Sequence, residues 1–334
     1  MTDDPDAGTA PDLDLSIVVI TKNEEERVRD CVESVLAAGR AAVDSFEVIL
    51  VDSASTDRTI ERAREYPVTI LQLPPDAAIS AGAGRHVGER AARGDMILHV
   101  DGDMVLTESW LPEAVGVLQT NADVGAVRGR LNEPSDGIEE LDTIGGLTLF
   151  DADVLLSVGG FDPGLISNED LDVGFRVTRA GYRILRLPGV SATHPTTEAL
   201  SEPLRRWSAG YYFGPGQAMR KWAGTPAIVW RLASIHNYEF TLLGWVGLGV
   251  LSTLATPLAA LAWLFISVLG VGAVTATLGL WEGLDFLLAK TLGTVGMLIG
   301  VTRGTSAGDS FSVDAAEVLQ EAPAQVGRRR SVDR

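Results

Sequence analysis

The sequence predicts an α/β domain with a mostly parallel sheet and flanking helices, followed by a transmembrane helical hairpin. Short β-branched runs alternate with segments of helical periodicity from Leu15 to about Leu187. Polar or acidic residues directly follow several of these runs. In a chain of 334 residues with a formal net charge of -18, no charged residue then occurs between Glu239 and Glu282. An uncharged stretch of that length is typical of membrane segments.

The first half of the domain alternates strand and helix. The apolar β-branched runs predict strands at residues 16–20, 46–51, 68–71 and 96–100. Helices are expected at residues 24–38, from a cap at Ser55 or Thr56 to about Glu65, and at residues 79–93. Ligands of such sheets bind outside the carboxyl ends of the strands, where Thr21, Asp52 and Asp101 fall.

The second half of the domain is less regular. Residues 124–131 and 147–150 are expected to be strands, and the glycine-rich residues 159–164 a turn. Glu169 to Ala180 is expected to be a helix closed by Gly181, followed by a strand at residues 182–187.

The uncharged stretch is roughly twice the length of one membrane crossing, at about 1.5 Å of rise per residue. We therefore expect a hairpin at about residues 240–281, turning near Thr256 and Pro257. Residues 284–301 carry Asp285 and Lys290 and are expected to form an interfacial or re-entrant helix, with a third crossing as the alternative. Basic residues flank the region on both sides, and two crossings place both flanks in the cytoplasm.

The expected organisation is a disordered acidic tail at residues 1–14, the α/β domain with a C-terminal interface segment at 15–222, a membrane region at 223–302 and a cytoplasmic polar tail at 303–334. The chain would be integral to the cell membrane, with its α/β domain on the cytoplasmic face. The negative charge excludes nucleic acid as a partner. Acidic residues outnumber basic ones and Arg is favoured over Lys, which suggests a protein adapted to high salt. The single cysteine, Cys31, is expected to be buried and inert.

The turn after the first strand excludes one class of enzyme. It reads Thr21-Lys22-Asn23-Glu24, without the glycines that let a backbone approach a dinucleotide pyrophosphate, so a nicotinamide or flavin enzyme is not expected. Asp52 ends the second strand, where its carboxylate would either accept hydrogen bonds from a nucleotide or cap the next helix.

Two further acidic motifs are candidates for chemistry. Asp101-Gly102-Asp103 closes the fourth strand, and paired carboxylates suit Mg²⁺ or Mn²⁺ that is also held by substrate phosphates. Glu169 and Asp170 open a helix, where Asp170 would deprotonate an acceptor hydroxyl while Glu169 orients it. The structural alternative is a capping box with Ser167. We expect the helix dipole to keep Asp170 ionised.

Taken in order, these motifs resemble the large inverting GT-A family 2 glycosyltransferases. The resemblance runs from about Leu15 to His194. It rests on an ordered set of segments: residues 21–24, 51–57, 84–88, 101–103, 159–162 and 169–172, with Arg176. His86 departs from the Asn that relatives often have.

The resemblance implies a GT-A fold, a UDP- or GDP-linked sugar donor and a divalent metal, Mg²⁺ or Mn²⁺. It implies that Asp170 is the catalytic base, assisted by Glu169. The implied metal ligands are Asp101, Asp103 and His194. The implied donor-binding residues are Thr21, Asn23, Glu24, Asp52, Arg85 and Asp101.

A membrane hairpin suggests a lipid-linked acceptor, and the archaeal type of protein glycosylation or surface polysaccharide assembly is the expected setting. Arg206 and Trp207 would lie at the headgroups and face the acceptor. Only the Arg-Trp of the Gln-x-x-Arg-Trp motif of processive members is present, so we expect transfer of one sugar. A processive polysaccharide synthase and a non-catalytic scaffold that binds nucleotide sugars are the alternatives.

Overall fold

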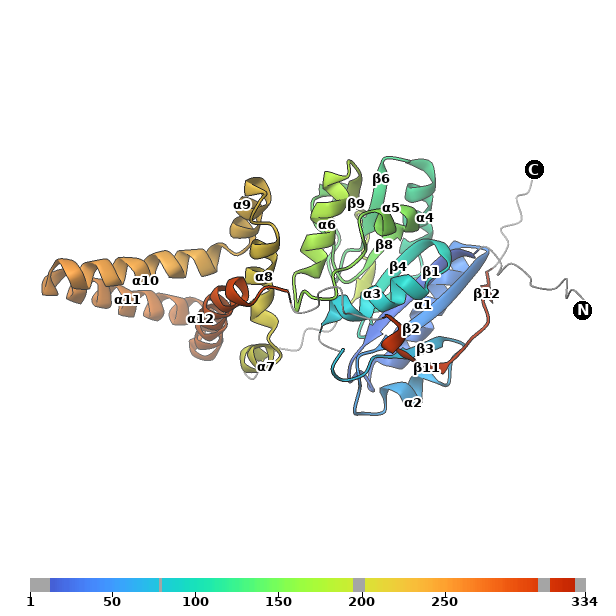
Figure 1. Ribbon diagram of the computed structural model, residues 1–334, viewed down its shortest axis with the longest axis horizontal. Coiled ribbons are helices and arrows are strands. Elements are labelled where there is room, and N and C mark those ends of the chain that lie inside the picture. The colour runs from blue at the N-terminus through green and yellow to red at the C-terminus, as the bar shows by residue number, and fades with distance from the viewer. Residues whose placement is uncertain (1–12, 78–79, 195–201, 306–312, 328–334) are drawn as a thin grey trace, which may run out of the picture. The chain divides into compact units, whose positions relative to one another are not determined.

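The computed structural model describes residues 13–77, 80–194, 202–305 and 313–327 (Figure 1). The expected disordered tail lies almost entirely outside these residues. The chain divides into two compact units: Met1–Pro163, Asp170–Pro195 and Ser310–Arg334 form the first, and Gly164–Glu169 and Thr196–Asp309 form the second. Residues 196–222, expected in the catalytic domain, thus belong to the second unit.

The first unit is built on a mixed ten-stranded sheet with the order β11-β3-β2-β1-β4-β8-β6-β9-β7, and β12 pairs with β2. Its central strands β3, β2, β1 and β4 are parallel, as the sequence predicts. The strands are β1 (Leu13–Thr21), β2 (Ser45–Asp52), β3 (Thr69–Gln72), β4 (Gly94–Asp101), β6 (Val124–Arg128), β7 (Glu139–Leu141), β8 (Thr148–Asp151), β9 (Arg183–Arg186), β11 (Glu317–Gln320) and β12 (Gln325–Val326). A separate pair joins β5 (Val105–Leu106) to β10 (Ala192–Thr193).

Helices cover both faces of this sheet (Figure 1). On one face, α1 (Val28–Ala42) and α4 (Trp110–Thr120) bury Val35 and Leu111 against inward residues such as Ile17. On the other face lie α3 (Ala81–Ala91), α5 (Ala152–Ser157) and α6 (Glu169–Arg179), whose buried residues include Val87 and Val173. Strands covered on both faces explain the continuous apolar runs of the sequence.

Several expected boundaries differ from the observed ones. The first helix begins at Val28, because residues 24–27 form a turn in which the Arg27 and Val28 amides donate to the Glu24 carbonyl. Neither Ser55 nor Thr56 caps the short α2 (Thr59–Ala63), whose N-cap position is Arg58; Asp57, just before it, accepts from the Thr59 amide at 3.0 Å. The sequence analysis did not predict α4, β11 or β12. Part of the expected polar tail at 303–334 is therefore in the sheet.

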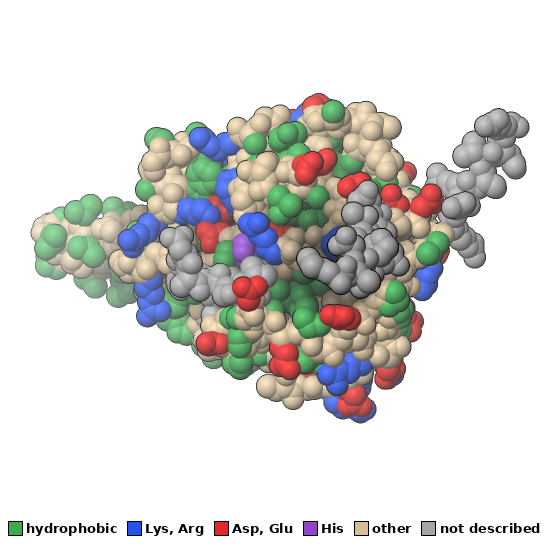
Figure 2. All heavy atoms as spheres, turned by 45° about the vertical axis from the view of Figure 1, so that its right-hand side comes forward, with side chains coloured by type: hydrophobic (Ala, Val, Ile, Leu, Met, Phe, Trp, Pro, Cys, Tyr) green, Lys and Arg blue, Asp and Glu red, His purple; other side chains and the backbone are tan. Residues whose placement is uncertain are grey.

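The second unit is helical. Its elements are α7 (Glu202–Ser208), the 3-10 helix η1 (Tyr211–Phe213), α8 (Gly214–Lys221), α9 (Pro226–Ile235), α10 (Asn237–Ala255), α11 (Pro257–Leu278) and α12 (Leu280–Arg303). The break between α10 and α11 at Thr256 is at the predicted turn, and Thr256 caps α11. Hydrophobic side chains cover the α10–α11 hairpin at the left of Figure 2.

Three of these helices, α10, α11 and α12, are long and apolar enough to cross a membrane. They differ in how much of their surface packs within the protein. No residue in the most apolar window of α11 is buried, against 11% for α10 and 28% for α12. The buried face of α12 carries Gly296 and Gly300, where an added Cβ would lie 2.5 Å from Tyr212 Cβ and 1.9 Å from the Phe213 carbonyl oxygen. Close packing against η1 therefore distinguishes α12 from the hairpin.

Candidate active site

Three predicted site residues lie side by side at the carboxyl edge of the sheet. In the parallel register, Thr21 of β1 pairs with Asp52 of β2, and Ile20 pairs with Asp101 of β4. The structure thus brings the ends of β1, β2 and β4 together as the strand pattern predicts.

The loop after β1 is tied to the loop after β2 by side chain to backbone hydrogen bonds. Asn23 adopts a left-handed backbone, with φ of 57°. Its Oδ1 accepts from the Thr56 amide at 2.8 Å, and its own amide donates to Ser55 Oγ at 2.8 Å. The Glu24 amide donates to Thr59 Oγ1 at 2.8 Å. Two of the three expected donor-binding residues on this loop, Asn23 and Glu24, therefore also fix its shape.

Asp52 is fully buried and its carboxylate is satisfied within the protein. Oδ2 accepts from the Ser55 amide at 2.8 Å and from Gln72 Nε2 at 3.1 Å, while Oδ1 accepts from Thr21 Oγ1 at 3.3 Å. The contact with the Ser55 amide forms a turn, but Asp52 does not cap the next helix, because α2 begins only at Thr59. Its hydrogen bonds to a nucleotide stay a prediction.

Asp101 forms an ion pair with Arg85, a residue of α3 that is almost fully buried. Arg85 Nη2 lies 2.6 Å from Asp101 Oδ1, and the Arg85 guanidinium also lies over the Phe161 ring, 5.5 Å from its centroid. Gly102 follows, and an added Cβ there would lie 2.4 Å from Thr21 Cγ2. Gly102 is therefore required for packing against β1.

Asp103 lies next to His194. Asp103 Oδ2 and His194 Nε2 are 3.1 Å apart. The two residues meet because Asp103 lies shortly before β5, His194 lies directly after β10, and these two strands pair. The Asn132 side chain holds the His194 backbone, accepting from its amide at 2.9 Å and donating to its carbonyl at 3.2 Å. The short antiparallel pair of β5 and β10 therefore brings together two predicted metal ligands that lie far apart in the sequence.

The Asp103 carboxylate has the features of a cation ligand. Its Oδ1 is buried and has no hydrogen-bond partner among the described residues. Burial raises the pKa of Asp103, as does the nearby Asp101, while His194 opposes the rise. Burial and Asp103 likewise raise the pKa of Glu24. A bound cation would relieve both effects. The described residues hold no group of three His, Cys, Asp or Glu side chains placed to bind a metal, so substrate oxygens would complete the site.

Asp170 stands at the start of α6. Its Oδ1 accepts from the Leu171 amide at 2.8 Å. Burial raises its pKa, while Arg85 and Arg128 lower it and Asp101 raises it. Burial thus acts against the helix dipole that the sequence analysis invoked, and the ionised state of Asp170 stays a prediction. A raised pKa makes Asp170 the stronger base.

Three predicted site residues remain, and all of them belong to the second unit: Glu169, Arg206 and Trp207. Glu169 is buried. Because α6 begins at Glu169, the expected capping box does not form, and Ser167 Oγ donates to the Tyr211 carbonyl at 2.7 Å. Arg206 Nε donates to Glu202 at 2.8 Å, and Trp207 packs edge-on against Phe213.

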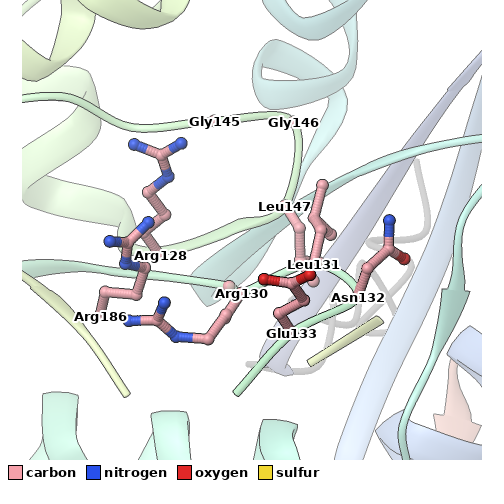
Figure 3. A pocket seen from close by; sticks show the side chains of 10 residues that line it. Arg128, Arg130, Leu131, Asn132, Glu133, Gly145, Gly146, Leu147 and Arg186 are labelled. Carbon is pink, nitrogen blue, oxygen red and sulfur yellow. The ribbon is translucent and has the colours of Figure 1, made fainter. Parts of the chain in front are cut away.

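The sequence analysis missed an arginine cluster. Arg128, Arg130 and Arg186 line one side of a cavity of about 430 Å³, with Leu131 and Leu147 opposite (Figure 3). Arg128 ends β6 and Arg186 ends β9, and the two are paired in the parallel register. Their position at strand ends was a usable signal, but only the pairing of β6 with β9 shows that they meet.

One known protein family matches a large part of the first unit. Residues 16–153 match the family described as Glycosyl transferase family 2. Over these residues the chain is a family 2 glycosyltransferase. It is therefore a glycosyltransferase enzyme, and its first unit has the GT-A fold.

Two curated relatives and one solved structure show the extent of the similarity. The glycosyltransferase AglE of Haloferax volcanii is 25% identical over 260 residues, which are 71% of this chain and 81% of the relative. The dodecaprenyl-phosphate galacturonate synthase of Rhizobium johnstonii is 35% identical over 113 residues, but these are only 32% of this chain and 33% of the relative. The mannosyltransferase PcManGT of Pyrobaculum calidifontis, solved with GDP-Man and Mn²⁺, has a TM-score of 0.62, 19% identity and coverage of 89% and 90%.

Proposed function

We propose that this glycosyltransferase transfers one sugar, with inversion, from a UDP- or GDP-linked donor to a lipid-linked acceptor. The observation that carries the proposal is the partly buried Asp103–His194 pair at the same sheet edge as Asp101, in a chain that also has long apolar helices. One oxygen of Asp103 has no hydrogen-bond partner in the part of the chain that the structure describes. Archaeal-type protein glycosylation or surface polysaccharide assembly is part of this proposal, as the setting in which a lipid-linked acceptor would be used.

The chain's own residues supply the remaining chemistry. Thr21, Asn23, Glu24, Asp52 and Arg85 shape the donor side, and Asp103, His194 and Asp101 would hold a divalent cation, Mg²⁺ or Mn²⁺. When bound, the cation supplies positive charge against the leaving diphosphate. Asp170, oriented by its neighbour Glu169, takes the proton of the acceptor hydroxyl. The acceptor oxygen then bonds to the anomeric carbon on the face opposite the leaving group, as the bond to the diphosphate oxygen breaks.

The second unit supports attachment to a membrane. We propose that α10 and α11 cross it and that α12, which packs closely on η1, lies at the interface. Arg206 and Trp207 would lie at the headgroups on the acceptor side. The basic residues before α10 and after α12 favour the cytoplasmic face for the catalytic unit.

A transfer assay tests the proposal. Membranes containing the full chain would receive labelled UDP- and GDP-sugars with Mg²⁺ or Mn²⁺ at molar salt. We expect label from one donor in the organic-extractable lipid, and none with Asp103→Ala. A ladder of products would instead support a processive synthase, and metal-dependent nucleotide binding without transfer from any donor would support the scaffold.

The Asp170→Asn variant tests the base in the same assay. We expect a loss of roughly 100-fold or more in kcat, the usual contribution of a positioned base. Near-wild-type transfer would show that Asp170 is not the base. An acceptor phosphate, which is already anionic, would explain that result.

A further inference from the structure

The arginine cluster, defined as Arg128, Arg130 and Arg186, contains a cation without a carboxylate partner. Glu139 lies 2.9 Å from Arg130 and pairs with Arg186. Arg128 forms no ion pair with any described residue, and its side chain makes one long hydrogen bond, 3.4 Å to Thr143 Oγ1. Arg40, Arg64 and Arg90 also form no ion pair with described residues, but they are exposed, whereas Arg128 is half-buried.

The surroundings of Arg128 add to this imbalance. Burial lowers its pKa, and the neighbouring Arg186 and Arg130 lower it further, against Asp170 and Glu139. A half-buried charge next to like charges is unfavourable unless an anion joins it. Guanidinium groups bind phosphate through two parallel hydrogen bonds, so a phosphate would suit this place.

The cluster adjoins the reacting groups. An added Cβ on Gly145 would lie 3.1 Å from Arg128 Nε, and one on Gly146 would lie 2.1 Å from Asp101 Oδ2. The Gly145–Gly146 backbone therefore runs from the cluster to Asp101. The charge of Arg128 also acts on Asp170.

The sheet order separates the cluster from the donor side. The predicted donor residues Thr21, Asp52 and Asp101 end β1, β2 and β4. Arg128 and Arg186 end β6 and β9, Arg130 follows β6, and β8 lies between β4 and β6. The side of the cavity opposite the guanidinium groups is mixed: Leu131 and Leu147 lie there beside Asn132 and Glu133 (Figure 3). The guanidinium groups suit a phosphate, and the two leucines offer apolar surface to a hydrocarbon chain attached to it.

We propose that Arg128, with Arg130 and Arg186, binds the phosphate of the lipid-linked acceptor and holds the acceptor beside Asp170. This proposal deepens the proposed function and rests on it in one respect: the bound lipid phosphate is taken to be the acceptor of the sugar. The binding site itself does not depend on turnover, so it can be tested separately.

The test is direct binding of phytanyl phosphate to the full chain in detergent micelles, compared with phytanol and inorganic phosphate. The Arg128→Gln variant should bind phytanyl phosphate roughly 10- to 100-fold more weakly, since a charged hydrogen bond contributes about 1.5–3 kcal/mol. Arg128→Lys should retain part of the affinity. Arg183→Gln, which removes an exposed arginine of β9 paired with Asp123 and Glu140, is the matched control and should bind normally.

The outcomes separate the cluster from the proposed function. Unchanged nucleotide binding with Mn²⁺ in Arg128→Gln would show an intact fold and donor side. Equal binding of phytanol and phytanyl phosphate by the wild-type protein would overturn the proposal. So would an Arg128→Gln variant that loses nucleotide binding but still binds phytanyl phosphate normally. Tight binding of inorganic phosphate alone would overturn the lipid assignment. Arg128-dependent binding of phytanyl phosphate without sugar transfer would support the site and contradict the proposed function.

Discussion

Asp52 and Asp103 lie at or just after the ends of two strands of one sheet, yet their oxygens have different surroundings. Asp52 accepts hydrogen bonds from Thr21, Ser55 and Gln72. Asp103 leaves Oδ1 buried without a partner among the described residues. A satisfied carboxylate stabilises a turn, whereas an unsatisfied buried oxygen is available to a ligand.

This difference gives the first prediction. Asp52→Asn should destabilise the first unit by about 1–3 kcal/mol, because an amide nitrogen replaces an acceptor of buried hydrogen bonds. Asp103→Asn should leave the thermal unfolding midpoint near that of the wild type and abolish Mn²⁺-dependent nucleotide binding. Calorimetry of both variants checks this. A stable Asp52→Asn protein without nucleotide binding would contradict the structural role of Asp52.

Glu89 gives a prediction about pH. It is buried in α3, accepts from the Phe161 amide at 3.1 Å and lies 3.2 Å from His86. Burial raises its pKa, against smaller opposite effects of His86, the Phe161 amide and Arg90. A carboxyl group with a raised pKa contributes its full stability below the unfolded value of about 4.5 and loses it as pH rises through the folded value.

We therefore expect wild-type protein to lose more stability between pH 5 and pH 8 than Glu89→Gln does, by at most about 1.4 kcal/mol per pH unit. Thermal unfolding midpoints at both values measure this. Glu113→Gln, at an exposed position of α4, is the control and should follow the wild type. Parallel curves for all three proteins would contradict the prediction.

At the scale of elements, α10 and α11 pack through aromatic and small residues. Trp245 and Trp263 stack with centroids 6.0 Å apart, and Trp263 Nε1 donates to the Trp245 carbonyl at 3.0 Å. An added Cβ on Gly249 would lie 2.6 Å from Trp263 Cε2, whereas one on Gly247 would meet nothing within 4 Å. Small residues let helices approach closely where no hydrophobic effect drives them together.

Gly249→Leu should therefore separate the two helices and destabilise the second unit by about 1–3 kcal/mol. Gly247→Leu makes the same change in composition on an open face of the same helix. Thermal unfolding in detergent should show a lower midpoint for the first variant and little change for the second. Equal midpoints would mean that the hairpin does not pack as described.

At the scale of the whole molecule, segments near the two ends of the chain share one sheet. β11 adds to the edge strand β3, and β12 pairs with β2. The Gly327 amide donates to the Asp44 carbonyl at 2.8 Å. The chain therefore returns to the catalytic unit after its apolar helices.

A chain ending at Gly304 should have a lower unfolding midpoint and a greater tendency to aggregate, because β3 becomes an exposed edge. A chain ending at Gly327 keeps both strands and should behave like the full chain. Light scattering during thermal unfolding compares the two. Identical behaviour would show that β11 and β12 contribute nothing to the stability of the sheet.

Net charge gives a second prediction at this scale. Acidic side chains are spread over the visible face of the molecule, and the formal net charge is -18 (Figure 2). Salt screens their mutual repulsion. Raising KCl from 0.1 M to 2 M should raise the unfolding midpoint by about 5 °C, which corresponds to roughly 1–2 kcal/mol. A midpoint that falls or stays constant would contradict adaptation to high salt.

The sequence by itself determined the parallel centre of the sheet and the edge at which Thr21, Asp52 and Asp101 meet. Apolar runs buried on both faces are a local signal, and parallel strands bring their carboxyl ends together without further information. The break between α10 and α11 was equally local, since Thr256 and Pro257 end one helix and start the next.

Only the tertiary structure decided which distant residues meet. It paired β6 with β9, which joins Arg128 to Arg186, and β5 with β10, which joins Asp103 to His194. It also buried Asp170, which raises the pKa of that carboxyl group, and it placed β11 on β3. Such pairings and the loss of hydration depend on packing between segments far apart in the chain. Local periodicity carries no information about them.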